Sequence, residues 1–535
     1  MSTAPLKVAF VVKDRYSNQI TRDLLIRFKN DSLIELSHLI VVKRSPRISA
    51  LEFLSSICLQ LILATEWLFL LRSRRIVSRI LNRCEISSLF MRSLEVNAED
   101  IKSGSLQKLS EVSVDLIVNL GDKVEGLGHF SKLSRLGVLD AEYTPQGVNS
   151  SFLAGFWEVF HKLDNSVFRI SRVHENGHQE GLLECLFQTR YCFLLNKSFL
   201  LKKSSVHFYN FVLEIAKSGQ LPSSTVSQDT SHVKMKPMRL TLIVVAFYIL
   251  KTLKIVLSKI FRILFFNGYQ WHVVIYNEAI KGRPTEKPRV IPNPPKRFLA
   301  DPFLVEHEAK TFCFVEDFES KSKKGRISCL EIHENTVTDV KVCLEEPFHL
   351  SFPYVFKFNN EFYMCPETCE SNQIRVYKAI NFPYDWKLEK VIMENVRAAD
   401  TLLFEMHGRW WMLTNIDPSR VGDNSSELYL YSAESPLSTN WVAHPSNPIY
   451  VDSCKARNGG ILVDQVTIYR VAQMQTFDTY GASIRINRID EIGRDVYKET
   501  LVASISPDYL PNILGTHHIS GTAKFSALDF YNLTK

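Results

Sequence analysis

The chain has 535 residues, of which 45% are hydrophobic and 23% are charged, as in a folded globular protein long enough for more than one core. Its formal net charge of +7 is small for this length, and no zinc-finger or RNA-binding motif accompanies it, which excludes a dedicated nucleic-acid-binding protein. The ten cysteines are scattered and form no CxxC pair, so they predict reduced thiols and no metal site.

Alternating strands and helices are predicted along the first part of the chain. Its strands are predicted at residues 6–13, 34–42, 114–121, 137–143, 166–172 and 181–189, and its helices at residues 16–29, 50–93 and 191–217. This order is typical of an open, mostly parallel α/β sheet of Rossmann type, which binds ligands at the carboxyl ends of its strands. No GxGxxG motif opens a helix, so a dinucleotide fingerprint is absent. The N-terminus also lacks the features of a signal peptide, so we expect a cytoplasmic protein.

Three segments of this part, residues 115–121, 137–138 and 155–159, resemble the N-terminal domain of folate-dependent formyltransferases. The resemblance implies a formyltransferase-like domain over residues 1–228, with 10-formyltetrahydrofolate as a candidate cofactor. In that family an Asn, a His and an Asp surround the formyl carbon, and the His polarises the formyl group. The corresponding positions are Asn119, Glu142 and Glu175, so a Glu stands where the His would be. Formyl transfer and a degenerate domain that serves binding or assembly are therefore both open.

A basic and apolar segment follows a Ser/Thr-rich stretch at residues 221–231, which predicts a domain boundary. Residues 240–250 are almost entirely apolar, and residues 230–276 contain seven Lys or Arg but no Asp or Glu. We predict an amphipathic linker helix over residues 229–270 that lies at an anionic membrane surface. A buried linker helix whose lysines reach solvent and a membrane-spanning helix are the alternatives, although the apolar run is short for the second.

A repeated pattern organises the rest of the chain. Residues 300–316 contain an apolar strand opened by a carboxylate, a turn, and a second apolar strand closed by a carboxylate. Similar patterns start near residues 352, 400, 458 and 517. A period of about 50 residues with several short strands is typical of a β-propeller with one blade per repeat. Five copies predict an all-β five-bladed propeller over residues 271–535.

Equivalent strand ends in a propeller converge around one axis, so side chains about 50 positions apart meet in a central cavity. The acids at these ends are Asp301, Glu316, Glu367 and Asp400. Repulsion among them would raise the pKa of one and leave another ionised, as acid–base chemistry on sugars requires. We therefore assign catalytic roles to Asp301, Glu367 and Asp400, and substrate contacts to Glu316, Arg457, His517, His518 and Trp411. The alternative is that these acids cap strand ends and accept hydrogen bonds from backbone amides.

Five motifs of this region appear in order, at residues 300–304, 349–356, 363–367, 399–401 and 444–448. Together they resemble the five-bladed propeller that forms the N-terminal domain of plant glucosamine inositolphosphorylceramide transferases, and they are similar to the propeller of family 43 glycoside hydrolases. The plant proteins carry their glycosyltransferase domain after the propeller, and this chain ends at Lys535, so we do not expect glycosyltransferase activity. The hydrolases use a base Asp, a pKa-tuning Asp and an acid Glu, residue types that Asp301, Asp400 and Glu367 supply.

These observations favour a carbohydrate-active protein of cell-surface glycan or glycolipid biosynthesis. Its propeller would bind a sugar or a glycolipid, its α/β domain would be degenerate, and it would lie in the cytoplasm at the inner face of the membrane. If the chain is an enzyme, the resemblances favour a transferase in a formyl- or glycosyl-transfer pathway. The alternatives are an aminosugar N-formyltransferase that uses 10-formyltetrahydrofolate and a glycoside hydrolase-like propeller enzyme.

Overall fold

The computed structural model describes residues 4–43, 50–70, 73–109, 111–120, 123–143, 153–222, 240–266, 268–280 and 282–534. Packing of the backbone divides the chain into two compact units, Met1–Leu257 and Ser258–Lys535. Their boundary falls inside helix α7 (Leu242–Phe265), within the segment predicted to be a linker helix. Most of the Ser/Thr-rich stretch lies outside the described residues.

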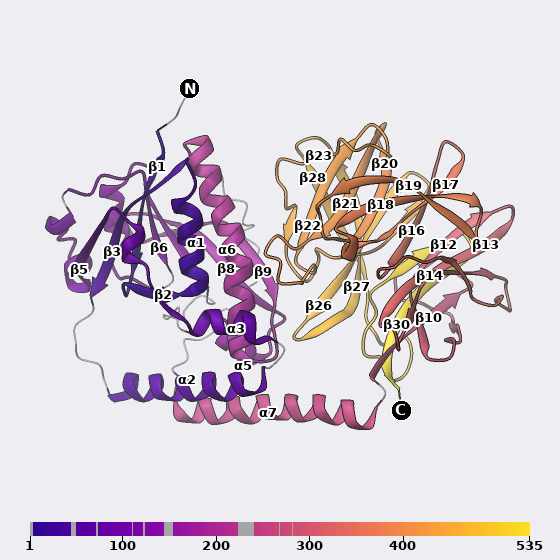
Figure 1. Ribbon diagram of the computed structural model, residues 1–535, viewed down its shortest axis with the longest axis horizontal. Helices are drawn as coiled ribbons and strands as arrows, with labels where there is room; N and C mark the ends of the chain where they lie inside the picture. The colour runs from indigo at the N-terminus through magenta and orange to yellow at the C-terminus, as the bar shows by residue number, and fades with distance from the viewer. Residues whose placement is uncertain are drawn as a thin grey trace. The chain divides into compact units, whose positions relative to one another are not determined.

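The first unit is built on a seven-stranded sheet in the order β5-β3-β1-β6-β7-β8-β9 (Figure 1). The strands are β1 (Leu6–Val12), β3 (Ile34–Lys43), β5 (Arg92–Asn97), β6 (Leu116–Leu120), β7 (Val138–Glu142), β8 (Asn165–Val173) and β9 (Gln179–Gln188). Every pairing from β5 to β7 is parallel, and β8 and β9 continue the sheet antiparallel. The predicted open, mostly parallel sheet with helices is confirmed.

Helices cover this sheet because its central strands are apolar on both faces. The helices are α1 (Gln19–Lys29), α2 (Ala50–Phe69), α3 (Arg74–Leu81), α4 (Ala98–Lys102), α5 (Phe156–His161) and α6 (Phe193–Ser218). In β1 only Lys7 is exposed, and Phe10 packs against Phe28 of α1 and Phe208 of α6. Helix α1 starts where the Asn18 side chain accepts a hydrogen bond from the Thr21 amide, which satisfies a free donor of the first turn.

The prediction of a helical region over residues 50–93 holds for α2 and α3 and is wrong after Leu81. After α2 and α3 the chain forms β4 (Arg83–Glu85), which pairs with β2 (Tyr16–Asn18), and then the edge strand β5. Of the six residues in β5 only Val96 is buried, so the strand carries little apolar periodicity and forms by pairing with β3. The helix predicted from residue 16 begins at Gln19, because residues 16–18 form strand β2, which pairs with β4.

The second unit consists of five small antiparallel sheets (Figure 1). Four are consecutive in sequence: β12 (Arg297–His307) to β15 (Lys341–Leu344), β16 (Ser351–Phe358) to β19 (Asp385–Glu394), β20 (Ala398–Met406) to β24 (Tyr450–Val451), and β25 (Asn458–Asp464) to β28 (Tyr497–Ile505). The fifth joins β10 (Gly268–Tyr276) and β11 (Arg289–Val290) to β29 (Ile519–Gly521) and β30 (Ser526–Thr534). The first and last strands of the unit thus complete one blade, and the predicted five-bladed β-propeller is confirmed.

The strands between the blade ends are β13 (Lys310–Glu319), β14 (Lys324–Ile332), β17 (Glu361–Glu367), β18 (Gln373–Asn381), β21 (Arg409–Ile416), β22 (Glu427–Ala433), β23 (Val442–Ala443), β26 (Thr467–Thr476) and β27 (Thr479–Ile492). Aromatic rings fill the space between neighbouring sheets. Phe303 of β12, for example, packs edge-on against Phe352 and Tyr354 of β16, with ring centroids 5.0 and 5.6 Å apart. The propeller core is therefore built from contacts between blades as well as within them.

A helix is present inside the predicted linker segment: it is α7, which has 24 residues. Among the helices of the described residues, none combines the length and the apolar character that crossing a bilayer requires.

Candidate functional site

The inner strand of three consecutive blades interrupts its pairing at the same point. The register shifts between Ala300 and Phe303, between Ser351 and Tyr354, and between Ala399 and Leu402. At each shift one residue adopts the left-handed region, Asp301 with φ 50°, Phe352 with φ 48° and Asp400 with φ 48°. A non-glycine residue in this region costs about 1–3 kcal/mol and recurs where it re-aims a side chain. The repeat seen in the sequence is therefore a repeated β-bulge that departs from the regular alternation of the strand.

These bulges border a cavity of about 240 Å³ to which all five sheets contribute. We call it the axial cavity, and its lining residues are Trp271, Phe298, Ala300, Asp301, Glu316, Phe318, His349, Ser351, Glu367, Asp400, Arg457, Tyr480 and His517. Six of the eight propeller residues proposed from the sequence line it. They are Asp301, Glu316, Glu367, Asp400, Arg457 and His517.

One side of the axial cavity is organised by Arg457. Its Nε donates to Asp400 Oδ2 at 2.7 Å, and its Nη2 lies 3.7 Å from Glu367 Oε2. Gln473 Nε2 donates to the same Asp400 oxygen at 3.1 Å. Burial and the neighbouring Asp400 raise the pKa of Glu367, which shares a hydrogen bond with Asp400. Glu367 therefore tends to hold its proton. It lies beside the Asp400 carboxylate, which pairs with the Arg457 guanidinium.

A second group of ionisable side chains around the cavity consists of His517, Asp529 and Asp301. His517 Nδ1 lies 2.6 Å from Asp529 Oδ2, and His517 Nε2 lies 3.5 Å from Asp301 Oδ1. Burial alone would lower the pKa of His517, but the Asp529 carboxylate outweighs it and the pKa is raised. Burial raises the pKa of Asp301, and the repulsion of Asp529 and Asp400 acts in the same direction. His517 is therefore a buried histidine whose protonated form Asp529 favours, and it faces a carboxyl group with a raised pKa.

His518 contacts Asp301 without lining the cavity. Its Nδ1 lies 3.8 Å from Asp301 Oδ1, and its ring packs edge-on against Phe303 with centroids 4.4 Å apart. Burial lowers the pKa of His518 to about 3, so the ring is neutral. His518 contacts Asp301 from outside the axial cavity, whereas the sequence predicts that it contacts the substrate.

Glu316 occupies the third position around the cavity. Its Oε1 lies 3.6 Å from His349 Nε2, while His349 Nδ1 accepts a hydrogen bond from the Gly325 amide at 2.8 Å. That bond places the proton of the neutral ring on Nε2, toward Glu316. Burial, followed by repulsion from Asp301 and Glu367, raises the pKa of Glu316 well above its usual range. A side chain at Gly325 would meet the Leu350 carbonyl oxygen at 2.4 Å, so only glycine allows this approach.

Asp301, His517 and Asp529 are close enough to hold a metal ion, with ligand atoms within 4.8 Å of one another. The donor set does not fit one well. Asp529 Oδ1 accepts from the His517 and His518 amides at 3.0 Å, and Asp529 Oδ2 accepts from the Asp301 amide at 3.2 Å and faces the His517 ring. These oxygens already serve N–H donors, which is the arrangement of a carboxylate that orients a histidine.

Aromatic rings complete the wall of the cavity. Trp271 of β10 stacks on the His517 ring with centroids 4.0 Å apart, and the Tyr480 ring lies 5.1 Å from the Arg457 guanidinium carbon. No site role is predicted from the sequence for Trp271, Tyr480, His349 or Asp529. The local signal for Asp529 is a single carboxylate inside the apolar run Ala527–Tyr531, and it is fully buried.

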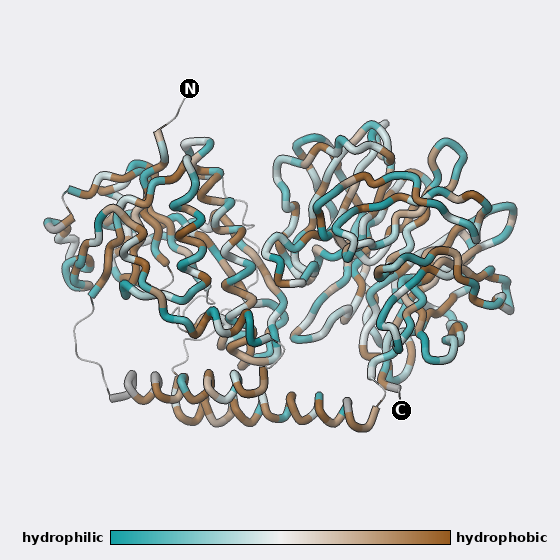
Figure 2. Tube along the Cα trace, in the orientation of Figure 1, coloured by the Kyte–Doolittle hydropathy of each residue, from teal (hydrophilic) through white to brown (hydrophobic). Residues whose placement is uncertain are grey.

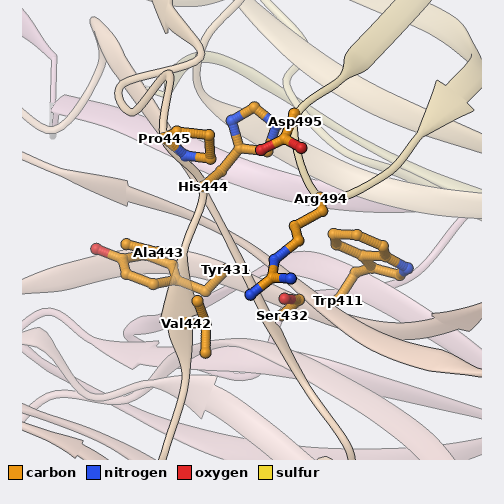
Figure 3. Close-up of a pocket in the computed structure, with 9 residues that line it drawn as sticks. All are labelled: Trp411, Tyr431, Ser432, Val442, Ala443, His444, Pro445, Arg494 and Asp495. Atoms are coloured by element: carbon orange, nitrogen blue, oxygen red, sulfur yellow. The ribbon is translucent and has the colours of Figure 1, made fainter.

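Trp411, which is predicted to contact substrate, does not line the axial cavity. It lies on β21 and lines a separate cavity of about 210 Å³ with His444 and Arg494 (Figure 3). Its Nε1 donates to the Met406 carbonyl oxygen at 3.0 Å, and 4% of the residue is exposed. The ring serves the packing of its blade, because the second strand of the blade does not reach the axial cavity at this position.

The pocket proposed in the first unit is only partly assembled. Asn119 at the end of β6 donates to Asp140 Oδ1 of β7 at 2.7 Å, and Gln179 donates to Asp140 Oδ2 at 3.1 Å. Burial and the neighbouring Asp140 raise the pKa of Glu142 to about 7. Glu175 has a side chain that is 58% exposed and forms an ion pair with Lys132 at 2.7 Å, so it belongs to the surface. The acid next to Asn119 is Asp140, which the sequence reasoning did not select.

Comparison with known proteins supports the resemblance of the propeller. Residues 290–508 match the family described as glucosamine inositolphosphorylceramide transferase 1, N-terminal. Over 214 residues the chain is 36% identical to glucosamine inositolphosphorylceramide transferase 1 of Arabidopsis thaliana and 35% identical to that of Oryza sativa subsp. japonica. Each match covers 39% of this chain and 28% of the relative, so the chain spans little more than a quarter of the length of these proteins.

Solved structures give a weaker likeness. The family 117 glycoside hydrolase Zg3597 of Zobellia galactanivorans is 10% identical with a TM-score of 0.32, and the match covers 49% of this chain and 90% of that one. The catalytic domain of the Coprinopsis cinerea GH62 α-L-arabinofuranosidase is 10% identical with a TM-score of 0.34, and the match covers 49% of this chain and 97% of that one.

Proposed function

We propose that the propeller binds carbohydrate, and that its axial cavity holds one sugar residue of a cell-surface glycan or glycolipid. The observation that carries the proposal is the convergence of six acidic and basic side chains from several blades beside Trp271 and Tyr480. Sugars are recognised by several polar groups around a ring whose face packs on an aromatic side chain. A cavity of about 240 Å³ suits a small ligand, since pockets for drug-sized molecules have volumes of about 300–1,000 Å³.

The matched relatives support a particular ligand class. They are named for glucosamine and inositolphosphorylceramide, and the region they share with this chain lies within the propeller unit. We therefore propose that the ligand is an aminosugar or a glycosylated lipid, and that the protein acts in glycan or glycolipid biosynthesis.

Binding to a glycan array tests this function directly. The full chain is expected to bind a restricted set of sugars, and Asp400→Ala is expected to lose that binding, because it removes the partner of Arg457 in the cavity. Arg494→Ala is the matched control, since Arg494 lines the separate cavity of Trp411. An array on which the folded full chain binds no glycan would overturn the proposal, and so would equal binding by Asp400→Ala.

Hydrolysis of a glycosidic bond is a second candidate, favoured by two carboxyl groups with raised pKa values that line the same cavity. Glu367 would donate a proton to the leaving oxygen, and Asp301, whose pKa is raised to about 7, would act in its ionised form as the base toward water. Glu367→Gln and Asp301→Asn are expected to lower release of a sugar reporter by at least about a hundredfold. Turnover that is equal in the parent and both variants would reject hydrolysis and leave the binding proposal intact.

For the first unit we propose a formyltransferase-like domain that binds a ligand without transferring a formyl group. Asn119 and Glu142 lie at the carboxyl ends of the parallel strands β6 and β7, where α/β sheets bind ligands, and Asp140 lies two residues before Glu142. Glu142 replaces the histidine of the formyltransferases, and a carboxyl group does not supply a cation to a developing oxyanion. Calorimetry with 10-formyltetrahydrofolate and nucleotide-linked aminosugars tests this proposal, and formylated product from the full chain would contradict it.

A further inference from the structure

Two helices of the first unit expose large apolar side chains on one connected surface. Helix α2 leaves Leu68 and Phe69 exposed by 60% and 65%, and helix α7 leaves Ile243 and Leu250 exposed by 69% and 62%. Both helices are coloured mainly as hydrophobic in Figure 2. Scattered apolar residues are normal on a protein surface, but a connected series along two helices indicates a binding surface.

The opposite faces of these helices are fixed to the protein. Tyr248 of α7 donates its hydroxyl to Glu66 of α2, and both groups accept hydrogen bonds from the Phe193 amide at the start of α6, at 2.7 and 3.1 Å. Glu66 also accepts from the Leu194 amide at 2.5 Å. Both side chains are buried in the unit. The helices therefore lie side by side on the fold, and their exposed apolar faces are not needed for packing within the first unit.

Charge identifies what covers this surface. The part of α7 that belongs to the first unit contains Lys251 and Lys254 but no acidic residue, and Glu66 of α2 is buried. Just after α2, Arg74 lies over the Trp67 ring at 4.7 Å. Apolar residues bordered by cations and an exposed tryptophan match the interface of an anionic bilayer. A second copy of the same surface would bring like charges together, which disfavours a homodimer through this face.

We propose that α2 and α7 form a membrane-docking surface that lies flat in the headgroup region of an anionic bilayer. The part of α7 in the first unit runs from Leu242 to Leu257, so at about 1.5 Å per residue it presents a face of about 24 Å. The proposal goes beyond the sugar site and does not depend on it. Because β10 begins at Gly268, directly after α7, docking would tether the propeller to the surface on which glycolipid headgroups are displayed.

Co-sedimentation of the full chain with vesicles tests the proposal. The protein is expected to pellet with mixed phosphatidylcholine and phosphatidylserine vesicles, less with phosphatidylcholine alone, and less as the salt concentration rises. The double variant Ile243→Gln with Leu250→Gln is expected to lower the partition coefficient by at least about tenfold. Lys254→Gln is expected to weaken binding to the anionic vesicles only.

The matched control carries the same chemical change on the propeller. Ile380 and Val466 are exposed by 68% and 89%, so Ile380→Gln with Val466→Gln is expected to bind vesicles like the parent. Far-UV circular dichroism should be unchanged in both doubles, because exposed side chains contribute little to stability. Failure of the parent to pellet would overturn the proposal. A mass that doubles with concentration and returns to monomer in Ile243→Gln with Leu250→Gln would assign the face to a second copy instead.

Discussion

Arg457 lies between Glu367 and Asp400 of the axial cavity. Its charge therefore affects the stability of the fold more than the charge of a surface arginine does. Its side chain is 15% exposed and Asp400 is 3% exposed, so neither charge is well solvated. Burial alone would lower the pKa of Arg457, but Asp400 and Glu367 raise it well above its usual range, and the residue stays a cation. A buried ion pair of this kind contributes modestly while intact, and breaking it leaves an uncompensated charge.

We expect Arg457→Met to lower the free energy of unfolding by about 3–5 kcal/mol, since Asp400 would lose its cationic partner. Arg409→Met is the control, because Arg409 pairs with an 83% exposed Glu434 at 2.9 Å and such pairs contribute about 0–1 kcal/mol. Urea unfolding followed by tryptophan fluorescence measures both. Equal losses in the two variants would mean that the buried pair is no more important than the exposed one.

The Asp529 carboxylate has a different role, which is to position other groups. It accepts hydrogen bonds from three backbone amides and holds the His517 ring, and its pKa is lowered by His517 despite burial. Asp529→Asn is expected to lower the pKa of His517, because the ring loses its main anionic neighbour. The C2 proton of His517 in NMR spectra reports this change, and Asp490→Asn on the propeller surface serves as the control. An unchanged titration of His517 would contradict the positioning role.

Among the helices, the contact of α2 with α7 makes stability depend on pH through Glu66. Burial raises the pKa of Glu66 to about 7, although four hydrogen bonds oppose the shift. Because the folded-state pKa exceeds the unfolded value of 4.5, the group stabilises the fold fully below pH 4.5, and the contribution is lost as the pH rises through 7.

We therefore expect the parent to lose on the order of 3 kcal/mol more than Glu66→Gln between pH 4.5 and pH 8. Other buried carboxyl groups titrate in both proteins, so the difference between the two curves isolates Glu66. Glu111→Gln, at an 86% exposed side chain, should follow the parent curve. Parallel curves for the parent and Glu66→Gln would show that the carboxyl group is not protonated in the folded unit.

The same elements explain what the sequence predicts and what it does not. Strands such as β1 are apolar on both faces, so a local pattern identifies them, whereas β5 buries only Val96 and forms through its neighbour. The repeat predicts which carboxylates share a cavity because consecutive blades place the same bulge at the same point of the inner strand. Trp411 was misplaced because adjacent tryptophans on β21 do not indicate which cavity a ring lines. Trp271 and Asp529 were missed because they belong to the sheet that closes the ring, and no local pattern encodes that pairing.

For the chain taken as a whole, the closing sheet is the point at which the propeller depends on residues far apart in sequence. Strand β10 pairs with β30 from Gly268–Thr534 to Tyr276–Ser526, and the Ser526 hydroxyl donates to the Glu278 carbonyl oxygen at 2.8 Å. Asp529 also lies on β30, so ring closure and the axial cavity share a strand.

Leu528→Ala on β30 is expected to destabilise the propeller by about 2–5 kcal/mol, because Leu528 is fully buried where the last strand joins the first. Two cores in one chain can unfold separately, so calorimetry should show one transition that falls and one that is unchanged. Leu39→Ala, at a fully buried residue of β3 in the first unit, should move the other transition. If Leu528→Ala leaves both transitions in place, or moves only the one that Leu39→Ala moves, closure by β30 does not hold the ring together. If instead the propeller transition falls and glycan binding weakens with it, the strand that closes the fold also maintains the site.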